Sequence, residues 1–225
     1  MQPELKGQVM IGARNPLTLV LALAVALSAV AAPPMTRSQA LQAIEQRDPE
    51  QRLAGIARLA EIGTMADADR LVPRLADDNG LVREVASAAM WQIWSRSGER
   101  AIDILFNRGV EQMQAGQFDA ALATFSEIVR RKPAFAEGWN KRATVLFLMG
   151  ENERSLRDCD EVLVRNPNHF GALSGAGQIH LKLGNTERAL EFFERALKIN
   201  PGLTGTAEVI EMLEQRLQDK RRRTI

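Results

Sequence analysis

The sequence predicts an all-helical fold, a solenoid built from stacked antiparallel helix pairs. Three series of residues recur with a common spacing of 34: Gly116, Gly150 and Gly184; Pro133, Pro167 and Pro201; and Leu122, Leu156 and Leu190. A period of this length is typical of tandem helix hairpins, each too small to bury its apolar face alone. Aromatic residues make up only 5% of the chain, so alanine and leucine supply most of the apolar content, which suits close helix packing.

Composition excludes several kinds of site. The net charge of +1 gives no general attraction to nucleic acid. The single cysteine, Cys159, excludes an internal disulfide and a cysteine-based zinc cluster. His169 and His180 have no third ligand at a metal-binding spacing. The glycine-rich residues 171–177 fall within a predicted helix and follow no strand, unlike a nucleotide loop. We therefore expect no catalytic residues, metal or cofactor.

The first 31 residues are predicted to be a secretory signal peptide. Residues 17–32 carry no charge, follow the basic Lys6 and Arg14, and include an Ala-Val-Ala sequence that places cleavage after Ala31. A membrane-spanning helix needs about 20 apolar residues, so this run is short for one. Two prolines after the cleavage site leave an uncleaved membrane anchor as an alternative. We expect export to a bacterial periplasm; an organelle is a weaker alternative, because the basic region is neither Arg-rich nor Ser-rich.

Residues 36–100 are predicted to form helix hairpins of a second kind. Asp48 followed by Pro49 is a helix start signal, and Gly63 is expected to end that helix. Asp67 or Asp69 is expected to start the next helix, and a turn over residues 77–80 precedes a further one.

This N-terminal segment resembles HEAT-like repeats, in which an Asp and an Arg open successive helices. The resemblance rests on the phrase Asp-Asn-Gly-Leu-Val-Arg-Glu-Val-Ala over residues 78–86 and on a weaker copy near Asp48. An equally acceptable interpretation is a helical cap that shields the first repeat from water. Trp91 and Trp94 lie one turn apart. We expect them to pack against the next hairpin rather than form an exposed platform, because tryptophan gains most when buried.

Residues 101–203 contain three units, 102–135, 136–169 and 170–203, that resemble the tetratricopeptide repeat. The family pattern is met by Trp139, by small residues at Gly109, Ala143 and Gly177 and at Ala121, Ser155 and Ala189, and by the recurring glycine and proline. The departures are at the family's Leu and Tyr positions, which hold Arg108, Arg142 and Ala176, then Gln112, Leu146 and His180. The resemblance implies a right-handed solenoid, closed by a capping helix over residues 206–222 within a C-terminal segment, 204–225, that ends in a basic tail.

The resemblance also implies a concave groove lined by the first helix of each unit, able to take an extended peptide or a partner helix. The residues expected to face it are Phe106, Val110 and Met113 in the first unit, Asn140, Thr144 and Phe147 in the second, and Ser174, Gln178 and Leu181 in the third. Some members of the family grip a C-terminal carboxylate with a clamp of Lys, Asn and Arg. The matching positions here are Phe106, Val110, Lys141, Gly171 and Gly175, so that clamp is absent.

Two further interpretations concern the second unit. Arg142 is expected to pair with Asp158 of the facing helix, and this structural role is favoured over a ligand-binding corner formed by Asn140, Lys141 and Arg142. Cys159 is expected to be an inert core thiol.

The sequence thus predicts a protein-binding scaffold without chemistry of its own. The alternative is a non-catalytic structural or regulatory subunit of a periplasmic enzyme or envelope-assembly complex.

Overall fold

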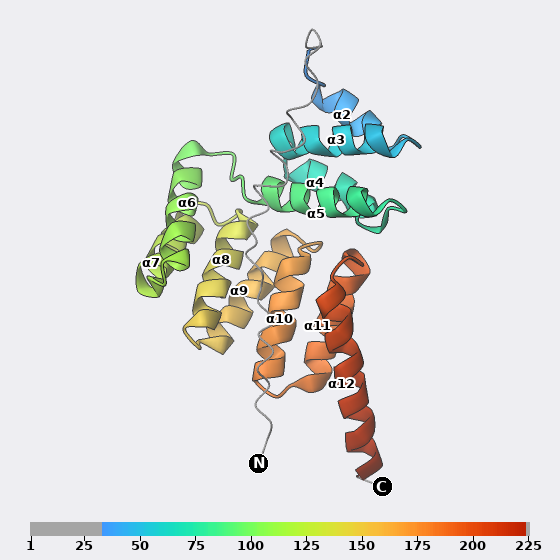
Figure 1. The fold of residues 1–225 in the computed structure, drawn as a ribbon. Coiled ribbons are helices and arrows are strands. Elements are labelled where there is room, and N and C mark those ends of the chain that lie inside the picture. The colour runs from blue at the N-terminus through green and yellow to red at the C-terminus, as the bar shows by residue number, and fades with distance from the viewer. Residues whose placement is uncertain (1–32, 224–225) are drawn as a thin grey trace.

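The computed structural model describes residues 33–223, which form eleven α-helices and one short 3-10 helix and contain no β-strand. The predicted signal peptide, residues 1–31, lies outside the described residues. Helices α2 to α5 form N-terminal hairpins, α6 to α11 form three hairpins of the repeat, and α12 closes the chain (Figure 1). The all-helical solenoid predicted from the sequence is confirmed.

The first hairpin joins α2 (Arg37–Ala43) to α3 (Pro49–Ile62). As predicted, α3 opens with Asp48 at its cap, whose carboxylate accepts a hydrogen bond from the amide of Glu50 at 3.0 Å, and ends at Gly63. The side chain thereby satisfies one of the amides that a helix start leaves unpaired.

The second hairpin joins α4 (Met65–Leu71) and the 3-10 turn η2 (Val72–Ala76) to α5 (Gly80–Trp94). The prediction that α4 starts at Asp67 or Asp69 is wrong, since Thr64 is the cap and α4 begins at Met65. Asp67 lies in the first turn instead, and its carboxylate accepts a hydrogen bond from the amide of Thr64 at 2.7 Å. An acidic residue in the first turn stabilises a helix as a capping residue does, and this explains the misplaced start.

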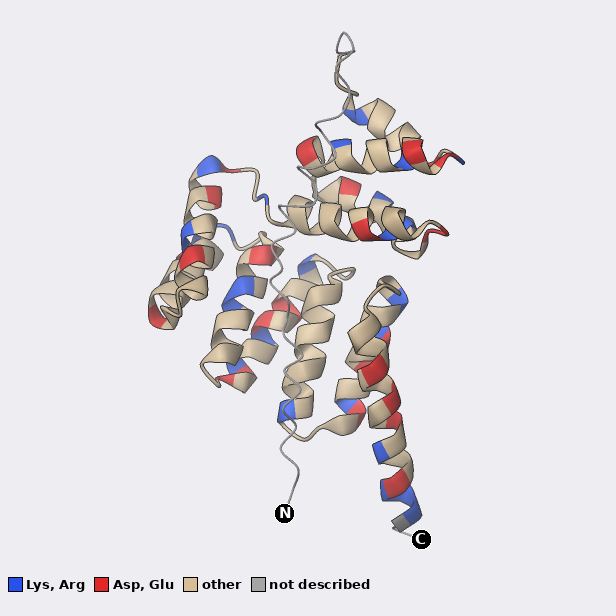
Figure 2. Cartoon of the chain, viewed as in Figure 1, with Lys and Arg blue, Asp and Glu red and all other residues tan. Residues whose placement is uncertain are grey.

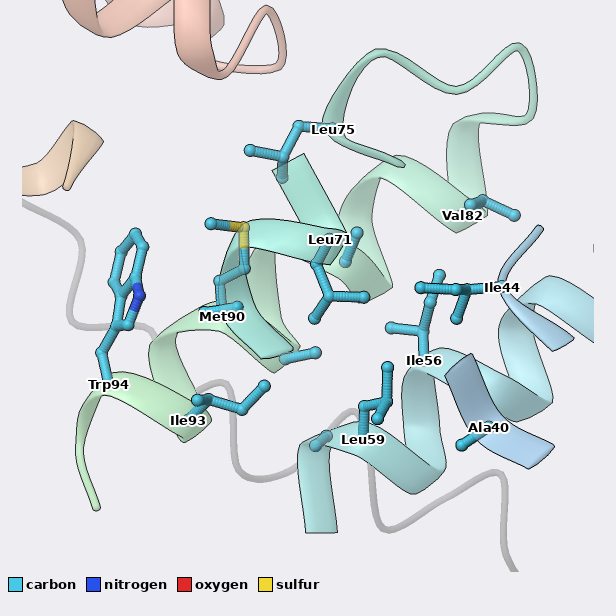
Figure 3. Close-up of a cluster of buried hydrophobic side chains, with 14 of the residues drawn as sticks. Ala40, Ile44, Ile56, Leu59, Leu71, Leu75, Val82, Met90, Ile93 and Trp94 are labelled. Atoms are coloured by element: carbon cyan, nitrogen blue, oxygen red, sulfur yellow. The ribbon is translucent and has the colours of Figure 1, made fainter. Parts of the chain in front are cut away.

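A buried arginine ties the two N-terminal hairpins together. The Nη2 atom of Arg52 on α3 donates to Asp77 at 2.7 Å and to Asp78 at 2.9 Å, in the turn before α5. An apolar cluster fills the space between the hairpins, from Ile44 at one end to Trp94 at the other (Figure 3). Of the Asp and Arg positions that carried the HEAT-like resemblance, Arg52 and Asp78 thus hold the two hairpins together, whereas Asp48 and Arg83 bond within their own hairpins.

The three repeat hairpins follow the 34-residue spacing. Their helix pairs are α6 (Arg100–Gln114) with α7 (Phe118–Arg131), α8 (Ala136–Leu148) with α9 (Asn152–Arg165), and α10 (Phe170–Lys182) with α11 (Thr186–Ile199). Gly116, Gly150 and Gly184 make the turns inside the hairpins with φ of +72°, +83° and +78°, a region that other residues rarely adopt.

The last helix, α12 (Thr204–Arg223), begins two residues before the predicted start at 206. Its Leu213 and Leu217 are buried, and Val209 and Ile210 pack beside Phe193 of α11, as the predicted apolar stripe requires. Its exposed face is densely charged, and basic and acidic residues are intermixed along the other helices (Figure 2). Within residues 33–223, no helix combines the length and apolar character needed to cross a membrane.

The N-terminal hairpins do not cover the first repeat hairpin. They lie across the start of α10 and the turn between α11 and α12, while α6 and α7 stand to one side (Figure 1). The interpretation of this segment as a cap that shields the first repeat is therefore wrong. Its apolar contacts fall on the third repeat hairpin, where Phe170 joins the N-terminal apolar cluster and Ile199 and Leu203 pack against it. The second repeat hairpin is contacted through Lys141, which lies against Trp91.

Candidate partner-binding groove

Small residues hold the two helices of each repeat hairpin close together. A Cβ atom on Gly109 would come within 2.8 Å of the Phe125 ring, and one on Gly177 within 2.8 Å of the Phe193 ring. In the second hairpin, the hydroxyl of Ser155 donates to the carbonyl of Ala143 at 2.7 Å. This close packing fixes the face that α6, α8 and α10 turn away from their partner helices.

On α6, the predicted groove residues lie against the core. Phe106 is only 4% exposed, and its ring lies 6.0 Å from that of Phe125 and 5.5 Å from that of Phe135. Val110 and Met113 are partly buried beside the same cluster. Phe106 therefore packs in the core in this structure. Helical periodicity gives the face of the helix on which a residue lies, but it does not distinguish a groove residue from a core residue on that face.

On α8, the three predicted residues have different surroundings. Asn140 is 8% exposed, and its amide donates to both carboxylate oxygens of Glu137 at 3.2 and 3.1 Å. Thr144 is partly exposed, and its hydroxyl donates to the carbonyl of Asn140 at 2.9 Å. Phe147 is partly exposed, with the ammonium of Lys182 4.8 Å from its ring centroid. Asn140 is therefore used internally, whereas Thr144 and Phe147 retain exposed surface.

On α10, Ser174, Gln178 and Leu181 are all partly exposed, and Leu181 packs beside the apolar cluster under α12. The Ser174 hydroxyl oxygen is buried without a hydrogen-bond partner in the described part of the chain. The structure thus leaves partly exposed side chains on all three first helices. The binding role of the nine predicted residues stays a prediction.

A buried polar network that sequence reasoning missed lies at the N-terminal ends of α8 and α10. Glu137 is fully buried and is reached by Asn140, by Lys141 Nζ at 3.1 Å and by His169 Nε2 at 2.9 Å. The amide of Ala172 donates to His169 Nδ1 at 3.0 Å, so Nδ1 is the acceptor and Nε2 carries the proton that is donated to Glu137.

Burial alone raises the pKa of the Glu137 carboxyl, but the Lys141 charge and the hydrogen bonds from His169 and Asn140 outweigh it and lower the pKa to about 2. Glu137 is therefore ionised at neutral pH. No sequence signal marked this network, because Glu137 and His169 are 32 residues apart and each occupies an ordinary first-turn or cap position.

The expected Arg142–Asp158 pair is confirmed. Arg142 Nε and Nη2 each donate to one oxygen of the Asp158 carboxylate at 2.7 Å, and the guanidinium also stacks on the Trp139 ring with 4.8 Å to the centroid. Cys159 is buried, as predicted, and burial raises the pKa of its thiol to about 12. Both residues are accounted for by structural contacts, and the ligand-binding corner at 140–142 is not supported by free polar groups.

Trp91 and Trp94 pack as expected, but against a different hairpin. The Trp94 ring stacks on His169 at 4.4 Å, and the Trp91 ring meets Phe170 edge-on at 5.5 Å. Both contacts join α5 to the start of α10 rather than to the α6–α7 hairpin. Among residues 33–223, no group of three or more His, Cys, Asp or Glu side chains is arranged to hold a metal ion.

Comparison with known proteins agrees with this repeat geometry. Tetratricopeptide repeat models match residues 106–158 and 170–203. A TPR repeat-containing protein of Rhizobium etli is 37% identical over 128 residues, which is 57% of this chain and 63% of that protein. Tetratricopeptide repeat protein 12 of Mus musculus is 29% identical over 113 residues, 50% of this chain and 16% of that protein. The chain thus spans less than two thirds of the length of these relatives.

Solved structures share the fold. The first TPR of Spaghetti (RPAP3), bound to the HSP90 peptide SRMEEVD, matches with a TM-score of 0.51 and 20% identity over 52% of this chain and 93% of that one. The Sgt2 TPR domain from Aspergillus fumigatus matches with a TM-score of 0.51 and 18% identity over 55% and 83%. From its helix hairpins, its spacing and these matches, the chain contains tetratricopeptide repeats over residues 106–158 and 170–203.

Proposed function

We propose that this protein is a protein-interaction module that holds a peptide or partner helix in the groove formed by its first helices. The observation that carries the proposal is the row of partly exposed side chains on α8 and α10, in which apolar Phe147 and Leu181 alternate with polar Thr144 and Gln178. Such a row offers pockets for apolar side chains and hydrogen bonds for a peptide backbone. The first TPR of Spaghetti, which shares this fold, is bound to an HSP90 peptide, and this supports a peptide as the partner.

Affinity capture with a matched control tests the groove. Tagged protein lacking residues 1–31 is used to capture partners from its native envelope fraction, beside a Phe147→Ala, Gln178→Ala double variant and a Val164→Ala variant. Val164 is 79% exposed on α9, a second helix of the repeat, and serves as the control position outside the groove. We expect the partner to be lost with the double variant and kept with Val164→Ala, while helical circular dichroism stays unchanged in both.

A second candidate function is a permanent subunit contact through the outer face. Val164, an apolar residue on the outer helix α9, is 79% exposed and could be buried by a subunit contact on this face. Loss of the partner with Val164→Ala, together with its retention by the groove variant, would support the outer face and contradict the groove proposal. A stable high-mass complex in extract would point the same way.

We also propose that the protein is exported, to a bacterial periplasm, with residues 1–31 acting as the signal. The uncharged run over residues 17–32 supports export. Cell fractionation followed by N-terminal sequencing tests it. A mature chain that begins at Ala32 supports a cleaved signal, an intact N-terminus in the membrane fraction supports the anchor, and an intact N-terminus in the cytosol contradicts export.

A further inference from the structure

The end of the groove that faces α5 is already occupied. Residues three or four apart share a helix face, so Gly171 continues the Ser174 and Gln178 row to the start of α10, and Lys141 lies one turn before Thr144 on α8. Trp91 of α5 lies against both of these positions. Its ring centroid is 5.7 Å from Lys141 Nζ, and the ring edge faces the backbone of Gly171.

The absence of a side chain at Gly171 makes room for the indole. A Cβ atom added there would come within 2.7 Å of Trp91 Cζ2, a distance that real Cβ contacts do not show. The same ring meets His169 edge-on at 5.2 Å. A Cβ atom added at Gly175, one turn further along α10, would meet no atom of another helix within 4 Å. Of these two glycines, only Gly171 lies where a side chain would clash with Trp91.

Further side-chain contacts surround Trp91 and join the N-terminal hairpins to the repeat hairpins. Trp94 and Phe170 are both buried within the apolar cluster of the N-terminal hairpins. Polar bonds flank this apolar contact: Asn168 donates to Asp69 at 3.0 Å, and Asn200 donates to Ser87 at 3.3 Å. Lifting α5 would expose the Trp94 and Phe170 rings to water, which is unfavourable.

We propose that the N-terminal hairpins are a fixed intramolecular ligand of the repeat groove, with Trp91 seated on Gly171. They deny this end of the groove to a peptide and confine any partner to the part lined by Thr144, Phe147, Gln178 and Leu181. The confinement of a partner rests on the proposed function. The seating of Trp91 does not, and it can be tested without any partner.

Matched glycine substitutions test the seating. Gly171→Ala and Gly175→Ala add the same atom to the same helix, but only the first meets the indole. In hydrogen exchange of the full chain, we expect Gly171→Ala to speed exchange of the amides in 87–95 and 168–173 by about tenfold or more, the size expected for a weakened local interface. We expect Gly175→Ala to leave those amides unchanged. Equal exchange profiles for the two variants would overturn the proposal.

A second variant covers the case in which Gly171→Ala unfolds the whole chain. Trp91→Ala removes the indole without forcing atoms together, and Trp94 and Phe170 still hold the interface. We expect the Lys141 amine, now uncovered, to be acetylated several-fold faster, as read by mass spectrometry against the exposed Lys198 in the same sample. An unchanged Lys141 rate in a folded Trp91→Ala protein would show that Trp91 does not cover the groove end, and would overturn the proposal.

Discussion

Glu137→Gln removes the carboxylate on which Asn140, Lys141 and His169 converge while keeping nearly the same shape. The unfolded carboxyl has a pKa near its ordinary 4.5, whereas the folded one has a pKa of about 2. Because the folded pKa is the lower of the two, ionised Glu137 stabilises the fold fully above pH 4.5. That contribution is lost as the pH falls towards 2. A difference of about 2.5 pKa units corresponds to about 3 kcal/mol of unfolding free energy.

Urea unfolding followed by circular dichroism at pH 7, 5, 4, 3 and 2.5 measures this contribution. The informative quantity is the unfolding free energy of the natural protein minus that of Glu137→Gln, because other titrating groups contribute to both. We expect this difference to shrink by about 2 kcal/mol between pH 5 and 2.5, most of the full contribution, because pH 2.5 is still above the folded pKa of about 2. Glu153→Gln, at an exposed position on α9, is the control and should show a difference near zero at every pH. A Glu137→Gln difference that does not change with pH would refute the assignment of the network's stability to the ionised carboxylate.

Three other predictions follow from the packing. Gly109→Ala places a Cβ within 2.8 Å of the Phe125 ring and should lower the unfolding free energy by about 1–3 kcal/mol in urea melts; an unchanged midpoint would argue against the close helix crossing. Arg142→Ala leaves the buried Asp158 carboxylate without its guanidinium and should cost about 2–3 kcal/mol, whereas changing both residues to leucine should cost less, as a double-mutant cycle would measure. Cys159, with a thiol pKa of about 12, should react with a thiol reagent at pH 8 only after unfolding, and rapid labelling of the folded chain would contradict its burial.

Much of the fold was predictable because repeated spacing constrains many residues at once. The turn glycines at Gly116, Gly150 and Gly184 and the small residues at the helix crossings each have one physical role, so their positions defined the hairpins. The pairing of Arg142 with Asp158 was predictable for the same reason, since an arginine facing the partner helix needs a buried counter-charge.

The groove was only partly predictable. Phe106 and Asn140 lie on the expected faces of α6 and α8, but helical periodicity does not say whether a side chain at the edge of a face turns towards solvent or towards a neighbour. Asn140 turns inward because the buried Glu137 carboxylate needs donors, which Asn140 and His169 of another hairpin supply together. Local sequence patterns do not indicate a contact such as that between Glu137 and His169, which lie in different hairpins.

The docking of the N-terminal hairpins was not predictable from the sequence. Trp91 and Gly171 are far apart in the chain, and glycine at the start of a helix carries no signal for an aromatic partner. The expectation that consecutive elements stack in order placed the two tryptophans on the next hairpin. In the structure the two tryptophan rings instead pack against His169 and Phe170 at the start of α10, in the third repeat hairpin.

Hydrogen exchange of the full chain with and without a captured partner tests the central claim most directly. If the partner lies in the part of the groove left open by α5, protection should appear over residues 144–148 and 178–182. Lys141 and Gly171, which already lie against Trp91 of α5, should exchange as in the free protein. Protection centred on 160–165 of α9, or new protection at the α5-facing end, would contradict the account.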